Sequence, residues 1–377
     1  MDLSFTAEEQ EFAHEIRTWL ATHLDLPPAF DSLDDEIAWG RAWQAKLAAD
    51  RWIGIHWPTA YGGRGASPVQ VAIYNMEYAR SRALQPVNRV GINLAGPTLL
   101  THGTEAQKQQ WLARILDASE IWCQLFSEPE AGSDLAALRT RAVPVPGGWR
   151  LEGQKVWTSY AQFARWGIGL VRTDPEASKH RGISFMVVDM EAEGIEIRPL
   201  VQITGEAEFN EVFFDGVFVP EDHLVGGLHE GWAVASTTLA HERGTAFPFK
   251  EQVVHEVFLD ELYALAAAHG TLDDVEISDA LAQSFVELRV LRLHNWRTLS
   301  RLARGIEPGP ESSLAKLAWT DMTQHLSDTA LDVLGASSPL AGKWSRQWLW
   351  SKAASIAGGT SEVQRSIIGE RILGLPR

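Results

Sequence analysis

Residues 126–134, with the sequence FSEPEAGSD, have the composition of a turn that could bind a ligand. The Glu-Pro step within the segment ends regular structure, and Gly132 allows the backbone to approach a ligand closely. Ser127 and Ser133, together with nearby backbone amides, offer hydrogen bonds to a flat polar heterocycle. An ordinary turn has the same composition, so this segment alone leaves both interpretations open.

A second segment with suitable chemistry is GQKVWTS, residues 153–159. Trp157 offers an aromatic face, and Thr158 and Ser159 add hydrogen-bonding groups. A tryptophan at this position is equally compatible with the core of a β-strand. Taken alone, this segment leaves open whether Trp157 contacts a ligand or fills a core.

The common phosphate and metal motifs are incomplete or absent in this sequence. The Gly-x-Gly pairs that begin at Gly63 and Gly167 both lack the third glycine of a dinucleotide-binding fingerprint. The sequence has no Walker motif, no HExxH zinc helix and no GxSxG nucleophile elbow. We therefore expect no metal site, and the hydrolase, kinase, Rossmann and zinc-helix classes lose support.

Two zones with different patterns must position these segments. Residues 1–118 have a helical pattern, which opens with a capping box at residues 6–9. From about residue 120 to about residue 222 the hydrophobic period changes to two, with Gly and Asp turns. This pattern predicts a compact antiparallel barrel or sandwich. Its expected strands are a hairpin around 142–151, then 167–172, 182–190, 195–200 and 210–219.

From about residue 230 the pattern is helical again, which favours a helical bundle. Residues 280–294 place four apolar side chains on one side of a helix: Leu281, Phe285, Leu288 and Leu291. Residues 320–334 and 360–373 have a similar pattern. No flexible linker separates the zones, so we expect them to pack as one body.

Composition and charge exclude several classes of partner and location. The chain has 377 residues, a formal charge of −16 and a single cysteine, Cys123. The acidic balance argues against nucleic-acid binding, which needs a basic footprint. One cysteine forbids an intrachain disulfide, and Cys123 is best explained as a small buried residue. The N-terminus does not resemble a secretory signal, and no stretch approaches a membrane span, so we expect a cytoplasmic protein.

The two chemical segments, in this order and spacing, resemble the flavin-binding stretches of the acyl-CoA dehydrogenases. The resemblance covers nearly the whole chain and includes WPTAYGGRGASP, HGTEAQKQQWL, EVFFDGVFVPEDHLVG and GGTSEVQRSIIGERILGLPR. It implies FAD as cofactor and an architecture that is mainly α with a β-barrel middle domain. The implied domains are an N-terminal helical domain, residues 1–118, a β-barrel, residues 119–225, and a four-helix bundle, residues 226–377.

The resemblance also assigns individual residues to the cofactor. In the first half of the chain they are Gln124, Leu125, Phe126, Ser127, Gly132, Ser133, Trp157, Thr158 and Ser159. Ser133 is further expected to lie near the thioester of the substrate. In the C-terminal part, Thr360 and Glu362 occupy the positions of flavin contacts, and Gly335 matches a segment that reaches FAD in the neighbouring subunit.

The catalytic base is where this sequence departs from much of the family. Oxidation of a saturated thioester removes a proton from Cα and a hydride from Cβ, and the hydride passes to the flavin. Many members place a glutamate directly before the Gly-Thr of the C-terminal motif, and here that position is Gly358. In the isovaleryl and long-chain branches the base instead precedes an arginine on a bundle helix. The segment LAHERGT aligns there, which makes Glu242 the candidate base and Arg243 its substrate-side neighbour.

A second departure concerns the adenine end of FAD and the partners of the chain. Residues 247–280 show no match to the Arg and Phe segment that in many members reaches the partner's FAD. The chain resembles actinobacterial dehydrogenases of steroid side-chain breakdown, some of which are mixed assemblies. We therefore expect a homodimer, a homotetramer or a hetero-oligomer, an acyl-CoA substrate and an electron-transferring flavoprotein as acceptor. The alternatives are a non-catalytic flavin-site subunit and an oxygen-using flavin oxidase or monooxygenase of the same fold.

Overall fold

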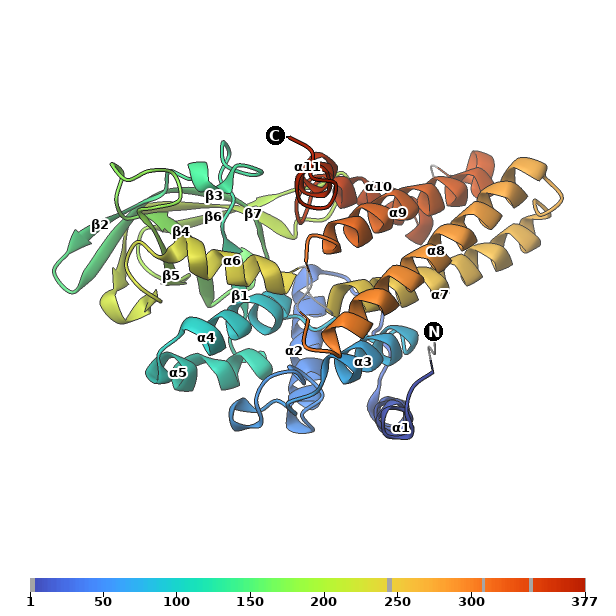
Figure 1. Ribbon diagram of the computed structural model, residues 1–377, viewed down its shortest axis with the longest axis horizontal. Helices are drawn as coiled ribbons and strands as arrows, with labels where there is room; N and C mark the ends of the chain where they lie inside the picture. The colour runs from blue at the N-terminus through green and yellow to red at the C-terminus, as the bar shows by residue number, and fades with distance from the viewer. Residues whose placement is uncertain (1–3, 243–245, 307–308, 339–341, 377) are drawn as a thin grey trace. The chain divides into compact units, whose positions relative to one another are not determined.

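The computed structural model describes residues 4–242, 246–306, 309–338 and 342–376 (Figure 1). Its contacts divide the chain into two compact units, and each is described here by itself. One unit contains residues 27–65 and 84–242, and the other contains residues 1–26, 66–83 and 243–377. No helix in the described ranges is long and apolar enough to cross a membrane.

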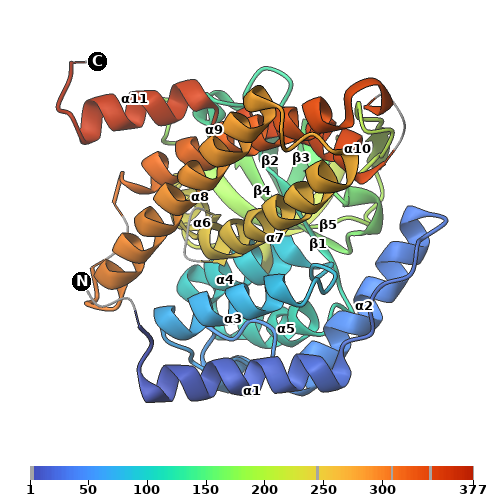
Figure 2. The same cartoon turned by 90° about the vertical axis from the view of Figure 1, so that its right-hand side faces the viewer.

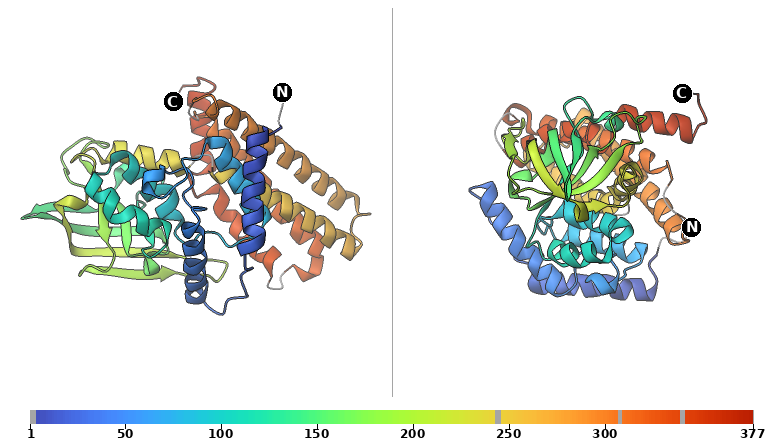
Figure 3. Two further views of the ribbon diagram at one scale, coloured as in Figure 1. Left: turned by 90° about the horizontal axis from the view of Figure 1, so that it is seen from below. Right: turned by 90° about the vertical axis from the view of Figure 1, so that its left-hand side faces the viewer.

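The first unit is organised around an eight-stranded sheet (Figures 1 and 3). Seven strands follow the order β6-β7-β3-β2-β4-β5-β8, and β1 pairs in parallel with β4 beside this path. The pairs β2/β3, β3/β7, β6/β7, β4/β5 and β5/β8 are antiparallel. The strand bounds are β1 Trp122–Leu125, β2 Arg141–Val145, β3 Gly148–Ser159, β4 Trp166–Arg172, β5 Ile183–Asp189, β6 Ile195–Leu200, β7 Phe209–Pro220 and β8 Leu224–Val225.

Inward-facing side chains of these strands fill the core of the sheet. Leu151, Val212 and Val217 are fully buried there, and Cys123 lies in the same cluster as the small buried residue that the sequence predicts. Burial raises the pKa of the Cys123 thiol far above its ordinary value, so the thiol stays protonated. The observed strand bounds confirm the predicted hairpin and the four further strands, with small shifts at their ends.

Helices of the first unit lie against the sheet (Figure 3). Their bounds are α2 Leu33–Ala49, α4 Gly96–His102, α5 Glu105–Leu116 and α6 Gly231–Glu242, with a π-helical turn, η2, at Gly91–Ala95. The amide of Gln107 on α5 donates to the backbone carbonyls of Asp222 and Leu224. Trp57 packs so closely on Gly96 that a Cβ there would meet its ring at 2.0 Å, and its Nε1 donates to Ile92 O. The motif WPTAYGGRG therefore anchors the helix that carries η2 and α4.

The second unit is helical (Figure 2). Helix α1 has the predicted capping box between Thr6 and Glu9. Leu262, Leu281 and Met322, on three different helices, are buried together in its core. The helix bounds are α1 Ala7–His23, α3 Pro68–Arg80, α7 Ala246–His269, α8 Val275–Leu302, α9 Ser312–Leu334, α10 Lys343–Ser351 and α11 Ser361–Arg371.

Three of the four apolar residues that the sequence places on one side of α8 are buried, and the fourth is not. Leu281, Leu288 and Leu291 are buried as predicted, but Phe285 is 45% exposed. Its ring instead lies beside the guanidinium of Arg289, 4.8 Å from the ring centroid. The helical period placed it at the edge of the apolar stripe, and an aromatic ring there can be covered by a neighbouring arginine stem. The fold class, helical terminal parts with a β middle, is confirmed, while the domain boundaries at 118/119 and 225/226 stay predictions.

Candidate functional site

The segment FSEPEAGSD leaves the sheet directly after β1. Leu125 and Phe126 turn their side chains into the core, and the ring of Phe126 lies 5.9 Å from that of Phe185. Gln124 and Ser127 are half-buried, and Ser133 is exposed. Of the residues that the sequence assigns to the cofactor here, Leu125 and Phe126 could therefore contact a ligand only through their backbone.

A tight turn shapes the middle of this segment. Glu128 and Ala131 exchange two backbone hydrogen bonds, of 3.2 and 3.0 Å. Beyond the turn, a Cβ built on Gly132 would meet nothing within 4 Å. Gly132 therefore lies in open space, and the hydroxyl of Ser133 beside it is accessible to a ligand.

The second segment contains a β-bulge that turns Trp157 outward. In the pairing of β3 with β7, Lys155 is opposite Val212 and Thr158 is opposite Asn210, so two residues of β3 face one of β7. Trp157 has φ +60°, and its side chain is 61% exposed. Its ring meets the edge of Phe209 at 6.0 Å between centroids.

The residues around Trp157 alternate across the strand. Ser159 is half-buried on the same outer side, whereas Thr158 is fully buried. The hydroxyl of Thr158 has no hydrogen-bond partner among the described residues, and its carbonyl accepts from Asn210 Nδ2 at 3.0 Å. Trp157 and Ser159 are thus the side chains of VWTS that a bound flavin could contact directly, and Thr158 would act through its backbone.

The pattern analysis missed the residue that joins the two segments, Lys155. Its side chain is fully buried, and Nζ donates to Glu128 Oε1 at 2.7 Å, Leu170 O at 2.8 Å and Phe126 O at 3.1 Å. Burial lowers the pKa of Lys155 to about 8. Burial acts to raise the pKa of Glu128, but the charge and hydrogen bond of Lys155, with donors at Thr140 and Arg139, bring it below its ordinary value. The sequence offered no local signal for it, because β3 also carries Arg150, Glu152 and Gln154.

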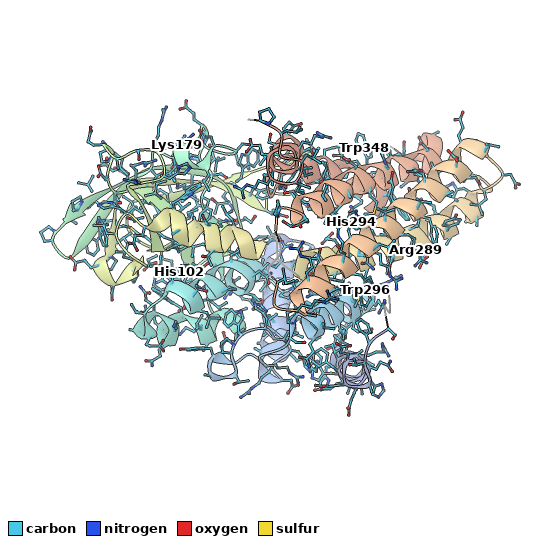
Figure 4. All side chains as sticks on the ribbon, viewed as in Figure 1. His102, Lys179, Arg289, His294, Trp296 and Trp348 are labelled. Carbon is cyan, nitrogen blue, oxygen red and sulfur yellow. The ribbon has the colours of Figure 1, made fainter. Side chains whose placement is uncertain are left out.

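The candidate base lies at the end of a helix that is firmly attached to its neighbours. Glu242 is the last residue of α6, and its side chain lies outside the described part of the structure. Four and five residues before Glu242, two hydroxyls of α6 bind α4. Thr238 binds the hydroxyl of Thr98 at 2.8 Å, and Thr237 binds Nε2 of His102, which Figure 4 labels, at 2.9 Å. Arg243 lies outside the described residues.

The C-terminal candidates belong to the helical unit. Thr360 is the N-cap of α11 and accepts from Val363 N, while Glu362 is exposed in the first turn. Gly335 ends α9 with φ +54°. Gly358 and Gly359 have φ +65° and +92°, so the position at which many members carry their glutamate has a left-handed backbone here. Among the described residues, no cluster of His, Cys, Asp or Glu could hold a metal ion.

Three family models together match nearly the whole chain. Residues 6–119 match the N-terminal domain of acyl-CoA dehydrogenase, residues 123–217 the middle domain and residues 229–373 the C-terminal domain. The chain belongs to the acyl-CoA dehydrogenase family. This membership identifies it as an oxidoreductase of that class with FAD as its cofactor.

Several named relatives support the same assignment for this acyl-CoA dehydrogenase. Acyl-CoA dehydrogenase IpdE1 of Mycobacterium tuberculosis is 38% identical over 98% of this chain and 98% of its own length. Acyl-CoA dehydrogenase FadE26 of the same organism is 32% identical over 100% and 99%. Among solved structures, the Tcur3481-Tcur3483 steroid ACAD has a TM-score of 0.86 at 30% identity, and the ChsE4-ChsE5 complex from M. tuberculosis has 0.85 at 31%; each match covers 100% of both chains.

The residues of the sheet unit fit a flavin. A flat ring system needs an aromatic or apolar face and hydrogen-bond donors at its edge, in a place that it can reach. The outward indole of Trp157, the half-buried Ser127 and Ser159, and the open space at Gly132 and Ser133 supply these features. Trp157 and Ser127 are also close in the fold, because Val156 N donates to Ser127 O at 2.9 Å.

Proposed function

We propose that the chain catalyses the α,β-dehydrogenation of an acyl-CoA thioester to the trans-2-enoyl-CoA. The observation that carries the proposal is the outward-turned Trp157, held by a bulge beside the serine-rich segment that follows β1. FAD, when bound, supplies the hydride acceptor. The residues of the chain orient the two reactants, exclude water and remove the Cα proton.

We assign the base to Glu242. The segment LAHERGT aligns with the base position of the isovaleryl and long-chain branches, and Glu242 is the last residue of α6. Gly358, the alternative position, has no side chain that could act as a base. We expect Arg243 to lie on the substrate side of Glu242.

Anaerobic bleaching of the bound flavin against a panel of acyl-CoA thioesters tests this proposal. The native protein should be bleached by at least one thioester, and the rate identifies the acyl class. Glu242→Gln should bind FAD with a native spectrum but be bleached about 10²–10⁴-fold more slowly, which is the usual cost of removing a catalytic acid–base group. Bleaching at the native rate in Glu242→Gln would exclude Glu242 as the base.

The substrate and electron acceptor are proposed more narrowly than the family requires. The solved structure named a steroid ACAD is similar over the full chain, which supports a bulky or branched acyl group, such as one derived from a steroid. We propose an electron-transferring flavoprotein as the acceptor. Rapid reoxidation of the substrate-reduced protein by air would favour the oxygen-using alternative, and slow reoxidation by air with fast dye reduction would favour the dehydrogenase.

A second candidate function is a non-catalytic flavin-site subunit of a mixed assembly. Two observations favour it: the left-handed glycine at position 358, and the similarity to a complex of two different chains, ChsE4 and ChsE5. Purification of the protein alone discriminates the two. A yellow, active homo-oligomer would exclude the silent-subunit function, whereas a colourless chain that gains FAD only with an unlike partner would support it.

A further inference from the structure

Lys155 is a buried cation whose three hydrogen bonds join two other segments of the sheet unit to β3. Its side chain is 1% exposed, and the three acceptors match the three N–H groups of an ammonium ion. A buried charge of this kind is tolerated only when it is paired and fully hydrogen-bonded. Lys155 meets that condition within β3.

Two of the three acceptors belong to the segment that follows β1. Phe126 O and the Glu128 carboxylate both bind Lys155, and the third acceptor, Leu170 O, belongs to β4. The next residue of β3 adds a backbone bond, from Val156 N to Ser127 O. The start of the serine-rich segment is therefore attached to β3 at three consecutive positions.

Glu128 extends this attachment to the far end of the same segment. Its carboxylate accepts from Arg139 N at 2.6 Å and from Thr140 N at 2.9 Å, in addition to Lys155. One buried carboxylate thus closes the loop between residues 128 and 139, which contains Gly132 and Ser133. The carboxylate that closes this loop is therefore the same one that pairs with Lys155.

On β3 itself, Lys155 lies immediately before the bulge. Trp157 follows two residues later and Ser159 four residues later, on the outer side of the strand. Lys155 therefore hydrogen-bonds to one flavin-binding segment, residues 126–134, and lies on the same strand as the other, residues 157–159. Stability alone does not require this arrangement, because apolar side chains of similar volume often replace a buried ion pair at no loss.

We propose that Lys155, through Glu128, is a positioning residue that sets the distance between the two flavin-binding segments, 126–134 and 157–159. This inference rests on the proposed use of those segments to bind FAD, and it is independent of Glu242. It assigns Lys155 no contact with FAD or substrate. Holding the two halves of the surface at a fixed separation before FAD arrives lowers the cost of binding the cofactor.

The test compares three variants of the purified full-length protein: Lys155→Met, the charge-free double variant Lys155→Met/Glu128→Gln, and the control Lys179→Met. Lys179 pairs with Asp134 at 2.6 Å on the same loop, but both side chains are about half exposed (52% and 57%), so its loss should have little effect. Figure 4 shows Lys179 at the surface of the sheet unit. The readouts are the dissociation constant for FAD, the shape of the visible absorption band of bound flavin, and Tm.

Lys155→Met should weaken FAD binding by about 10- to 100-fold and alter the flavin band, because the segment loses its two side-chain bonds to β3 and keeps only the backbone bond at Val156. The double variant should regain much of the lost Tm, since no unpaired buried charge remains, but should not regain FAD affinity. Lys179→Met should match the native protein in FAD affinity and in Tm. FAD affinity in Lys155→Met within twofold of native, or recovery of affinity together with Tm in the double variant, would overturn the inference.

These outcomes are separate from those of the proposed reaction. A protein that binds FAD but is bleached by no acyl-CoA would count against the dehydrogenase function and leave the role of Lys155 standing. Conversely, if the native enzyme is active and Lys155→Met binds FAD as the native protein does, only the positioning role is excluded.

Discussion

The backbone at Trp157 permits a prediction in which stability and cofactor binding move in different directions. A left-handed φ of +60° costs a residue with a Cβ about 1–2 kcal/mol, and glycine avoids most of this cost. The indole offsets little of it by burial, since it is 61% exposed and makes one edge contact with Phe209, of a kind that contributes about 0.5–1.5 kcal/mol. Trp157 is therefore strained without a matching gain in the flavin-free protein.

Replacing Trp157 by Gly or by Ala separates the two contributions. Trp157→Gly should leave the free energy of unfolding of the flavin-free protein within about 1 kcal/mol of native, because relief of strain and loss of the Phe209 contact nearly cancel. Trp157→Ala loses the same contact but keeps the strain, so it should be about 1 kcal/mol less stable than Trp157→Gly. Urea unfolding of the flavin-free proteins measures both differences.

Binding of FAD should respond to the indole and not to the backbone. Both variants should bind FAD at least about tenfold more weakly than native, which corresponds to about 1.4 kcal/mol for the lost aromatic face. Phe218→Ala is the control, because it removes a 45% exposed aromatic side chain from β7. Native affinity in both Trp157 variants would refute a flavin-contacting role, and a loss of more than about 3 kcal/mol of stability would indicate that Trp157 is a core residue.

Three further predictions follow from contacts within single units. Thr98→Val and Thr238→Val should each lower the free energy of unfolding by about 1 kcal/mol. The double variant should lose less than the sum, because both hydroxyls of a fully buried 2.8 Å pair are then removed. Urea unfolding of the three variants measures this coupling. Burial lowers the pKa of His255, so the unfolded chain binds the proton more readily, and the free energy of unfolding should fall as pH drops below about 6.5. His255→Gln should flatten this dependence in unfolding curves measured at several pH values, and an unchanged slope would contradict it. Cys123 should react with a thiol reagent only after unfolding, which a spectrophotometric thiol assay with and without urea can follow.

Features with a strong local signal were predictable from the sequence. The capping box at Thr6 and Glu9 and the hairpin of β2 and β3 depend on residues close in the chain, and both appear where the pattern placed them. Phe285 shows the limit of such patterns, because helical periodicity cannot decide which edge of an apolar stripe a neighbouring arginine will cover. Burial at a stripe edge depends on tertiary contacts.

The candidate site was predictable in its residue types but not in its geometry. Motif similarity proposed Trp157 and Ser133 as site residues. The bulge that turns Trp157 outward depends on how β3 pairs with β7, whose paired residues lie more than fifty positions later in the chain. Lys155 was missed for a related reason. Its significance comes from acceptors at Phe126, Glu128 and Leu170, which approach it only when three separate segments are assembled.

The left-handed backbone at Gly358 bears on how this chain differs from relatives with a glutamate there. At φ +65° a side chain with a Cβ costs about 1–2 kcal/mol in backbone strain, so the difference is larger than the loss of one carboxylate. The neighbouring Gly359 is also left-handed, and Gln364 Nε2 donates to the carbonyls of both glycines, at 3.1 and 3.3 Å. The turn before α11 is therefore built around two glycines and fastened to the helix that follows. A glutamate at position 358 would add this strain to the turn, which supports looking for the base on α6 instead.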